Sequence, residues 1–179
     1  MMESHVQAVP LPDPEETEPT RDVAVPFEEF FELQHARLFG ALSVMTGDRF
    51  EAEEVMQDSF LRIWERWDRI SAMDDPVGFL YRTAMNLYRK RLRRAALAVR
   101  KAANLAPEGD ALDTVETRDE AVRLLRTLTP REREAIVLTA YLGYSTEEAG
   151  KLLGIKANTV RVLTMRARNS LRQTVEERP

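Results

Sequence analysis

Five basic side chains and no acidic one lie between Lys156 and Arg172. Cations along one helix can neutralise DNA phosphates and donate hydrogen bonds to base edges in the major groove. The segment before them predicts a short capped helix, because Glu148 follows Ser145 at capping-box spacing and Gly154 suits the left-handed residue after a last turn. Two such helices, with the charge on the second, are typical of a DNA-binding helix-turn-helix. An ordinary pair of amphipathic helices is the alternative.

A second basic segment lies upstream. Between Pro76 and Pro107 there are eight lysine or arginine residues and no acidic one, with Phe79, Tyr81 and Tyr88 interleaved. Guanidinium groups contact phosphates and aromatic faces stack on unpaired bases, so this segment is a second candidate nucleic-acid surface. Core packing is the alternative for the aromatic residues, and it fits Phe79 best.

An acidic cluster forms the third candidate site. Glu54, Gln57 and Asp58 fall within about one helical turn and can share an exposed face. They could be a carboxylate site of a hydrolase, a solvated helix face, or a docking surface for a basic protein. The hydrolase interpretation is the weakest, because His35 is the only histidine of the expected ordered region and no second ligand motif accompanies it. We expect no catalytic residue, no metal and no cofactor.

The composition favours a helical, cytoplasmic protein. Helix formers dominate the 179 residues, and glycine occurs only seven times. The absence of cysteine excludes disulfides and thiolate metal sites and fits a reducing compartment. No apolar run reaches the length of a membrane span, so no membrane association is expected. Residues 1–29 hold eight acidic side chains and one basic one, so the rest of the chain is net positive although the total charge is −4.

These segments are expected to be positioned by an all-α fold. Residues 1–25 predict a disordered acidic tail. Helices are expected from about Pro26 to Met45 with Gly47 ending the first, from a cap at Asp48 (with Glu51) to about Trp67, and from Asp75 to about Arg100. Residues 101–117 predict a flexible linker. Helices resume at 119–128 and at 130–142, the latter behind a Thr129 capping box, so two small helical domains are expected at 26–100 and 118–175.

Three stretches, in this order, resemble the extracytoplasmic-function branch of bacterial RNA polymerase sigma factors. They are GDRFEAEEVMQDSFLRIW, FLYRTAMNLYRKRLRR and LTPREREAIVLTAYLGYSTEEAGKLLGIKANTVRVLTMRAR. The resemblance covers most of residues 26–175. It implies a region 2 helical bundle followed by a region 4 helix-turn-helix, and an alternative sigma factor that directs promoter-specific transcription initiation without being an enzyme. The implied partners are core RNA polymerase, through its β′ clamp helices and β flap, and promoter DNA; an anti-sigma factor is a further candidate.

The resemblance also implies roles for individual residues. The acidic helix matches the segment that docks on the β′ clamp helices, which makes Glu54, Gln57 and Asp58 the candidates for polymerase binding. The second basic segment matches the elements that read and melt the −10 element. Its candidates are Tyr81, Arg82, Asn86, Arg89 and Arg91. The second helix of the helix-turn-helix would read the −35 element. Its candidates are Lys156, Asn158, Thr159, Arg161, Arg166 and Arg168.

The chain departs from the family pattern at the turn and within the last helix. Lys156 stands where a small polar cap is usual, and because lysine is a poor cap, Asn158 is expected to cap the helix instead. Leu163 and Thr164 replace a typical arginine and a typical core leucine. Two other functions remain open: a transcriptional regulator that uses only the helix-turn-helix, and a nucleic-acid enzyme such as a nuclease. The acidic helix favours a sigma factor, since a regulator does not need it.

Overall fold

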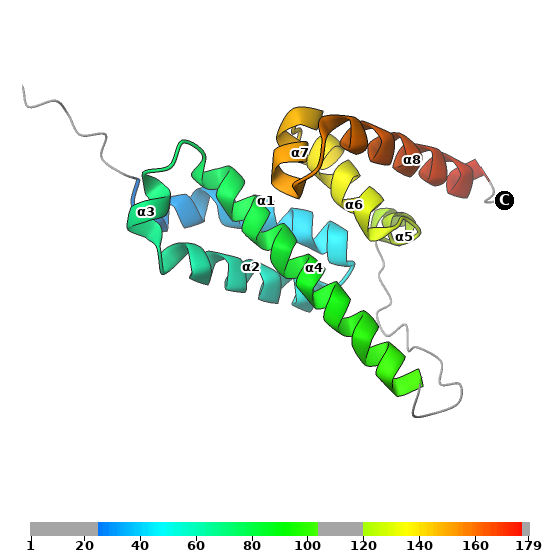
Figure 1. The fold of residues 1–179 in the computed structure, drawn as a ribbon, viewed down its shortest axis with the longest axis horizontal. Helices are drawn as coiled ribbons and strands as arrows, with labels where there is room; N and C mark the ends of the chain where they lie inside the picture. The colour runs from blue at the N-terminus through cyan, green and yellow to red at the C-terminus, as the bar shows by residue number, and fades with distance from the viewer. Residues whose placement is uncertain (1–24, 104–119, 177–179) are drawn as a thin grey trace, which may run out of the picture.

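The computed structural model describes residues 25–103 and 120–176, and within these ranges every regular element is a helix (Figure 1). The predicted all-α fold is therefore confirmed for this part of the chain. The expected acidic tail and most of the expected linker lie outside the described residues. The elements are α1 (Phe27–Thr46), α2 (Arg49–Trp64), α3 (Trp67–Ser71), α4 (Pro76–Ala103), α5 (Glu120–Arg126), α6 (Pro130–Ile136), the π-helical η1 (Val137–Tyr141), α7 (Thr146–Leu153) and α8 (Ala157–Glu176).

The connection between α1 and α2 follows from two local signals. Gly47 ends α1 in a left-handed conformation, with φ of 69°, which glycine adopts without a steric penalty. The Asp48 carboxylate then accepts backbone hydrogen bonds at the start of α2, as predicted. The backbone N–H of Asp48 donates to Thr46 Oγ1 at 3.0 Å. The Thr46 hydroxyl therefore accepts the hydrogen bond that was expected to go to the Glu51 side chain. α2 stops at Trp64, before the expected end.

The long helix α4 is capped as the sequence predicts. Asp75 Oδ1 accepts the N–H of Gly78 at 2.7 Å. The helix continues to Ala103, beyond the expected end near Arg100. Residues 93–100 are all exposed, and the last turns extend beyond the other helices in Figure 1.

The helix that begins at Pro130 has a feature that the sequence did not predict. Its start matches the expectation, since Thr129 and Glu132 form a reciprocal capping box. After Ile136 it widens into η1, where the N–H of Leu142 donates to the carbonyl of Val137, five residues back. Such π turns are uncommon and often occur at functional positions. Here η1 packs against α1, as α5 and α6 also do.

The helices α7 and α8 form the predicted helix-turn-helix. Ser145 and Glu148 make a capping box, and Gly154 is left-handed with φ of 67°. Gly150 also matters for the turn, because a Cβ at this position would lie 2.8 Å from the carbonyl oxygen of Ile155. The turn can therefore pass directly over α7 only because this residue lacks a side chain.

The expected cap of α8 is wrong. The helix begins at Ala157, and the carbonyl of Lys156 accepts the N–H groups of Thr159 and Val160. Lys156 thus occupies the cap position with its backbone, and Asn158 lies inside the first turn. The turn already fixes the path of the chain, so no side-chain cap is needed to start the helix.

Thr164 takes a core position although its side chain is polar. It is 7% exposed, and its hydroxyl lies 3.4 Å from the hydroxyl of Thr139. Thr139 also bonds the carbonyl of Ala135 at 2.8 Å. The Thr164 hydroxyl is tolerated in the core because the Thr139 hydroxyl faces it across the contact between α8 and η1.

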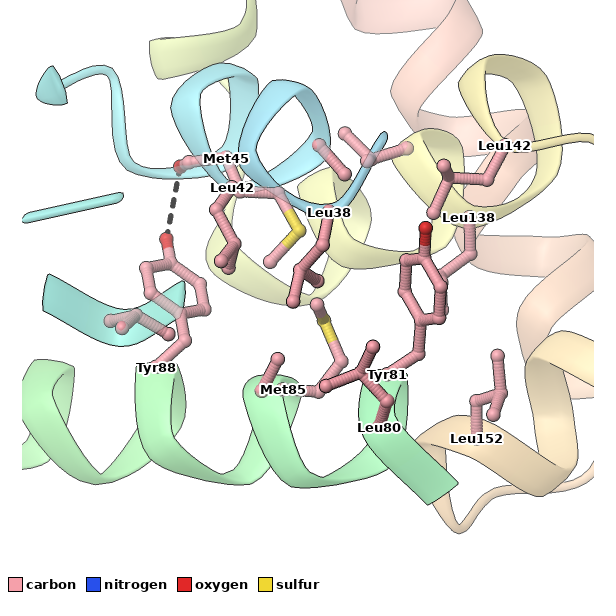
Figure 2. Close-up of a cluster of buried hydrophobic side chains, with 14 of the residues drawn as sticks. Leu38, Leu42, Met45, Leu80, Tyr81, Met85, Tyr88, Leu138, Leu142 and Leu152 are labelled. Carbon is pink, nitrogen blue, oxygen red and sulfur yellow. Dashed lines mark hydrogen bonds between the residues drawn. The ribbon is translucent and has the colours of Figure 1, made fainter. Parts of the chain in front are cut away.

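The N-terminal helices (α1–α4) and the C-terminal helices (α5–α8 with η1) share one buried core. A continuous cluster of apolar side chains runs from Leu38 and Leu42 on α1, through Tyr81 on α4, to Leu138 and Leu152. Figure 2 shows the Tyr81 ring pointing from α4 toward Leu138 and Leu142, while Tyr88 donates to the carbonyl of Met45 at 3.1 Å. The two groups are therefore packed against each other and not merely linked. The cluster's members at the contact are Leu38, Leu42, Tyr81, Met85, Leu138, Leu142 and Leu152.

Candidate polymerase and nucleic-acid interfaces

The predicted acidic residues of α2 are accessible, and the structure brings them together. Glu54 and Gln57 are exposed and Asp58 is half-buried. Arg91 of α4 forms ion pairs with both carboxylates, reaching Asp58 Oδ2 at 2.9 Å and contacting Glu54 Oε2. The hydrogen bonds that Arg91 donates to these carboxylates, first of all to Glu54, hold the pKa of Arg91 above its usual value. A residue predicted for the −10 surface is thus attached to two residues predicted for polymerase binding.

Sequence reasoning missed the apolar part of the same face. Phe50, Leu61 and Trp64 are 79%, 53% and 59% exposed. With Glu54 and Gln57 they recur every three or four residues, so the five side chains form one stripe along α2. Large apolar side chains on a surface are a sign of a partner interface when they gather. Their helical spacing opposite the buried Ala52, Val55 and Ile63 was the signal that could have revealed them.

Two of the five predicted −10 residues on α4 are exposed, and the other three are buried or held in ion pairs. Arg82 and Asn86 are exposed and lie one turn apart. Tyr81 is fully buried, with its ring 5.8 Å from that of Tyr144 in an edge-on contact. Burial raises the pKa of Tyr81, so its hydroxyl stays protonated. In this arrangement of the helices the Tyr81 ring is not available to an unpaired base.

Arg89 forms an ion pair with a residue of the C-terminal helices. Its Nε lies 3.2 Å from Oε1 of Glu134, a fully buried carboxylate of α6, and the Arg89 side chain is 16% exposed. Arg131 reaches the other oxygen of Glu134 at 3.3 Å. Loss of hydration on burial raises the pKa of Glu134 and lowers the pKa of Arg89.

The predicted −35 residues are all accessible. The exposed side chains are Lys156, Asn158, Thr159, Arg161, Arg166 and Arg168. Arg161 and Arg168 line a groove together with Arg172, beside the start of α7 at Ser145 and Thr146. Arg161 lies 3.9 Å from Glu147, but both side chains are 64% exposed, so this ion pair is weak. The groove presents three guanidinium groups and the hydroxyls of a helix start, an arrangement suited to a phosphate backbone.

Two further findings concern metal binding and membrane crossing. Within residues 25–103 and 120–176, no three histidine or carboxylate side chains gather in a cluster that could hold a metal ion. None of the helices in these ranges has the length and apolarity needed to cross a membrane.

Comparison with known proteins accounts for both helix groups. Residues 30–97 match the family described as Sigma-70 region 2, and residues 118–171 match Sigma-70, region 4. The chain belongs to the sigma-70 family, in its extracytoplasmic-function branch. As a member of this family it is an alternative sigma factor, which binds core RNA polymerase and promoter DNA and directs transcription initiation. A regulator that used only its helix-turn-helix would not account for the region 2 match.

Individual relatives resemble the chain over most of its length. The RNA polymerase sigma-E factor of Streptomyces avermitilis is 28% identical over 155 residues, which are 85% of this chain and 86% of that protein. The ECF RNA polymerase sigma factor SigE of Mycolicibacterium smegmatis is 30% identical over 83% of this chain and 62% of that protein. Among solved structures, the sigma factor RpoE of Bartonella quintana, in complex with the anti-sigma factor NepR, has the same fold, with a TM-score of 0.70 at 22% identity over 86% of this chain and 98% of that one.

Proposed function

We propose that the two helix groups divide the work of this sigma factor between them. Residues 26–100 would form region 2, which binds the polymerase and recognises and melts the −10 element, and residues 118–175 would form region 4, which binds the −35 element. Sigma factors are initiation factors, and we infer that this one has no enzymatic activity of its own and acts in the cytoplasm without a cofactor.

The strongest support for the polymerase assignment is the stripe on α2. Glu54 and Gln57 supply polar groups, with Asp58 beside them, and Phe50 and Trp64 supply large exposed apolar surface at the two ends of the stripe. Aromatic anchors beside polar groups are typical of the residues that dominate protein–protein binding. We therefore place the β′ clamp helices against this stripe, and we extend the predicted site to Phe50, Leu61 and Trp64.

The DNA assignments rest on charge and accessibility. Arg82 and Asn86 present a cation and an amide on one exposed face of α4, where they can meet phosphate and base edges. Tyr81, Arg89 and Arg91 would join them when their present partners release them. On α8, Arg161 and Arg166 are the proposed base readers, and Arg168, with Arg172, is proposed to contact phosphate; Lys156, Asn158 and Thr159 complete the −35 set.

An anti-sigma factor is a further proposed partner. The solved relative RpoE is held by the anti-sigma factor NepR in its complex, and the two chains share a fold. A protein partner that stabilised the packed arrangement of the two helix groups would keep Tyr81 and Arg89 away from DNA. The β flap of the polymerase is the corresponding proposed partner of the C-terminal helices.

The polymerase assignment is tested with Glu54→Lys combined with Asp58→Lys. Truncating charged groups at an interface typically costs about 2–5 kcal/mol, and charge reversal adds repulsion, so co-purification with core polymerase should be lost. Helicity by circular dichroism should not change, because both side chains lie outside the core.

Glu28→Lys combined with Glu29→Lys is the matched control. Both residues are exposed in the first turn of α1, and the change in net charge is the same. Retained polymerase binding by the α2 variant, or equal loss in both variants, would remove the stripe from the interface.

A further inference from the structure

One carboxylate lies within the basic surface of the helix-turn-helix. Three arginines line the groove beside the start of α7, and two lysines, Lys151 and Lys156, line a shallow hollow at the turn. Glu147 also lines this hollow, and its Oε1 lies 3.9 Å from Nη2 of Arg161 in the groove. Among the residues that line the two depressions, it is the only one with a carboxylate. A negative charge here opposes the attraction of DNA phosphates to the surrounding cations.

We propose that Glu147 is a specificity-determining residue of −35 recognition, which accepts a hydrogen bond from the exocyclic amino group of a cytosine or an adenine, next to the base that Arg161 contacts. This role rests on the proposed −35 function of α8. It adds the start of α7 to the parts of the protein that read bases, and it uses a residue that neither the basic segment nor the capping pattern marks in the sequence.

The start of α7 holds the Glu147 carboxylate in place. The Thr146 hydroxyl donates to Oε2 of Glu147 at 3.0 Å. The hydrogen bond from the backbone N–H of Glu147 itself, and then the bond from Thr146, hold the pKa of this carboxyl below its usual value, so it is ionised at neutral pH. Glu147 lies in the first turn of α7, where the helix dipole also favours a negative charge. The acceptor is therefore charged and oriented before DNA arrives.

Arg161 leaves the carboxylate of Glu147 available to a further donor. The 3.9 Å between Arg161 Nη2 and Glu147 Oε1 exceeds the length of a hydrogen bond. Both side chains are 64% exposed, so water screens their attraction. Oε1 therefore keeps its lone pairs for another donor, and Arg161 keeps its N–H groups for a base. The two side chains present an acceptor and a donor next to each other on the surface.

The chemistry of the major groove decides which bases such an acceptor can contact. On a given strand, cytosine N4 and adenine N6 offer amino groups, whereas guanine O6 and thymine O4 are acceptors. A carboxylate that faces an acceptor or a phosphate makes no hydrogen bond and is repelled. Glu147 should therefore act mainly by weakening the binding of sequences that lack an amino group at this position.

A purely structural role for Glu147 leads to a different expectation. An acidic residue in the first turn stabilises its helix, so its loss would make α7 less stable. A less stable helix-turn-helix would bind every promoter more weakly by the same factor. It would not change which base is selected at one position, and the selected sequence is therefore the readout that separates the two roles.

The test uses holoenzyme, assembled from core polymerase and the full-length protein, on promoters randomised in the −35 element. Glu147→Ala removes the acceptor, and Glu147→Gln replaces it with an amide that can also donate to guanine or thymine. Glu176→Ala is the matched control, because it removes the same charge from an exposed position of α8 outside both depressions. Melting of each variant, followed by circular dichroism, measures its stability.

We expect the unmodified holoenzyme to select cytosine or adenine at a position adjacent to the one that depends on Arg161. Glu147→Ala and Glu147→Gln should each lower that preference by about fivefold or more, the lower end of what one mismatched base pair typically costs. Glu147→Ala should also bind promoters with a guanine or thymine there more tightly, because a repelled charge is gone. Arg161→Ala should instead bind its own preferred promoters more weakly.

Three results would overturn the proposed role of Glu147. They are an unchanged selected sequence in Glu147→Ala, an equal change in affinity for all promoters in either direction, and the same loss of preference in Glu176→Ala.

Failure of the underlying −35 assignment has a different signature. If α8 does not bind the −35 element, Arg161→Ala and Arg168→Ala will leave both the selected sequence and the affinity of the holoenzyme unaltered. If those two variants show their expected effects and Glu147→Ala does not, α8 remains the −35 helix and only the role of Glu147 is rejected.

Discussion

Arg91 is bound to the same two carboxylates that we propose for the polymerase contact. The ion pairs with Glu54 and Asp58 lie at the surface, where such pairs contribute about 0–1 kcal/mol. That is too little to matter for folding, but enough to compete with a partner. While Arg91 is bound, it partly neutralises the acidic cluster, and it is unavailable to DNA.

Replacing Arg91 with alanine should therefore strengthen polymerase binding and weaken promoter opening. The expected gain in core affinity is up to about fivefold, because the competing pair is worth no more than about 1 kcal/mol. Titration of labelled sigma with core polymerase measures it. Lys90→Ala makes the same charge change one residue away, at an exposed position, and should leave core affinity unaltered. Weaker core binding by Arg91→Ala would show that Arg91 itself positions the carboxylates.

At the scale of single elements, α8 presents its arginines on more than one face. Arg161 and Arg168 line the groove beside Ser145 and Thr146, whereas Arg166 does not. Residues near the start of a recognition helix reach base edges, and residues farther along contact the backbone. Arg161 should therefore read sequence, and Arg168 should supply affinity without preference.

This division predicts different outcomes for two single substitutions. With holoenzyme and promoters randomised in the −35 element, Arg161→Ala should relax the selected sequence. Arg168→Ala should keep that sequence and lower the slope of log affinity against log salt by about one. An unrelaxed −35 preference in Arg161→Ala would mean that another residue of α8 is the reader.

Helix caps and helix ends could be predicted from the sequence, because the groups that form them lie within a few residues of one another. Asp48, Thr129 and Ser145 cap helices where the spacing predicted them, and Gly47 and Gly154 end helices in the left-handed conformation. The start of α8 was mispredicted, because a rule about side-chain caps was applied where the backbone of Lys156 accepts the first helical bonds.

Long-range contacts could not be read in this way. Glu134 looks like one more charged residue of an amphipathic helix, and nothing near it indicates that Arg89 approaches it. Tyr81 was a candidate for base stacking because it is an aromatic residue among cations, yet its environment is set by helices more than fifty residues away in the chain. Exposure of Phe50, Leu61 and Trp64 likewise depends on which face of α2 the other helices cover.

At the scale of the whole molecule, Arg133 joins the two helix groups. Its guanidinium donates to the carbonyls of Leu125, Arg126 and Leu128 and, across the junction, to that of Met45. Because the apolar core is continuous as well, the described helices should unfold together.

Calorimetry should therefore show one unfolding transition for the unmodified protein. Arg133→Ala should lower the transition temperature and separate it into two, with the C-terminal helices melting first, since the variant loses four hydrogen bonds, one of them across the junction, each worth about 0.5–1.5 kcal/mol. Arg123→Ala, at an exposed position of α5, should do neither. Two transitions in the unmodified protein would show that the shared core does not couple the groups.

The π turn of η1 sets the direction in which the residues after it point from the helix. Each residue of a regular helix turns the next by about 100°, so one residue more or fewer would rotate everything beyond Val137 by that angle. Leu138 would then leave the shared core. A single insertion or deletion here would leave composition, charge and motifs almost intact and still change how the two halves of the protein meet. The length of this helix therefore decides how the two helix groups pack, in a way that charge and motif content do not record.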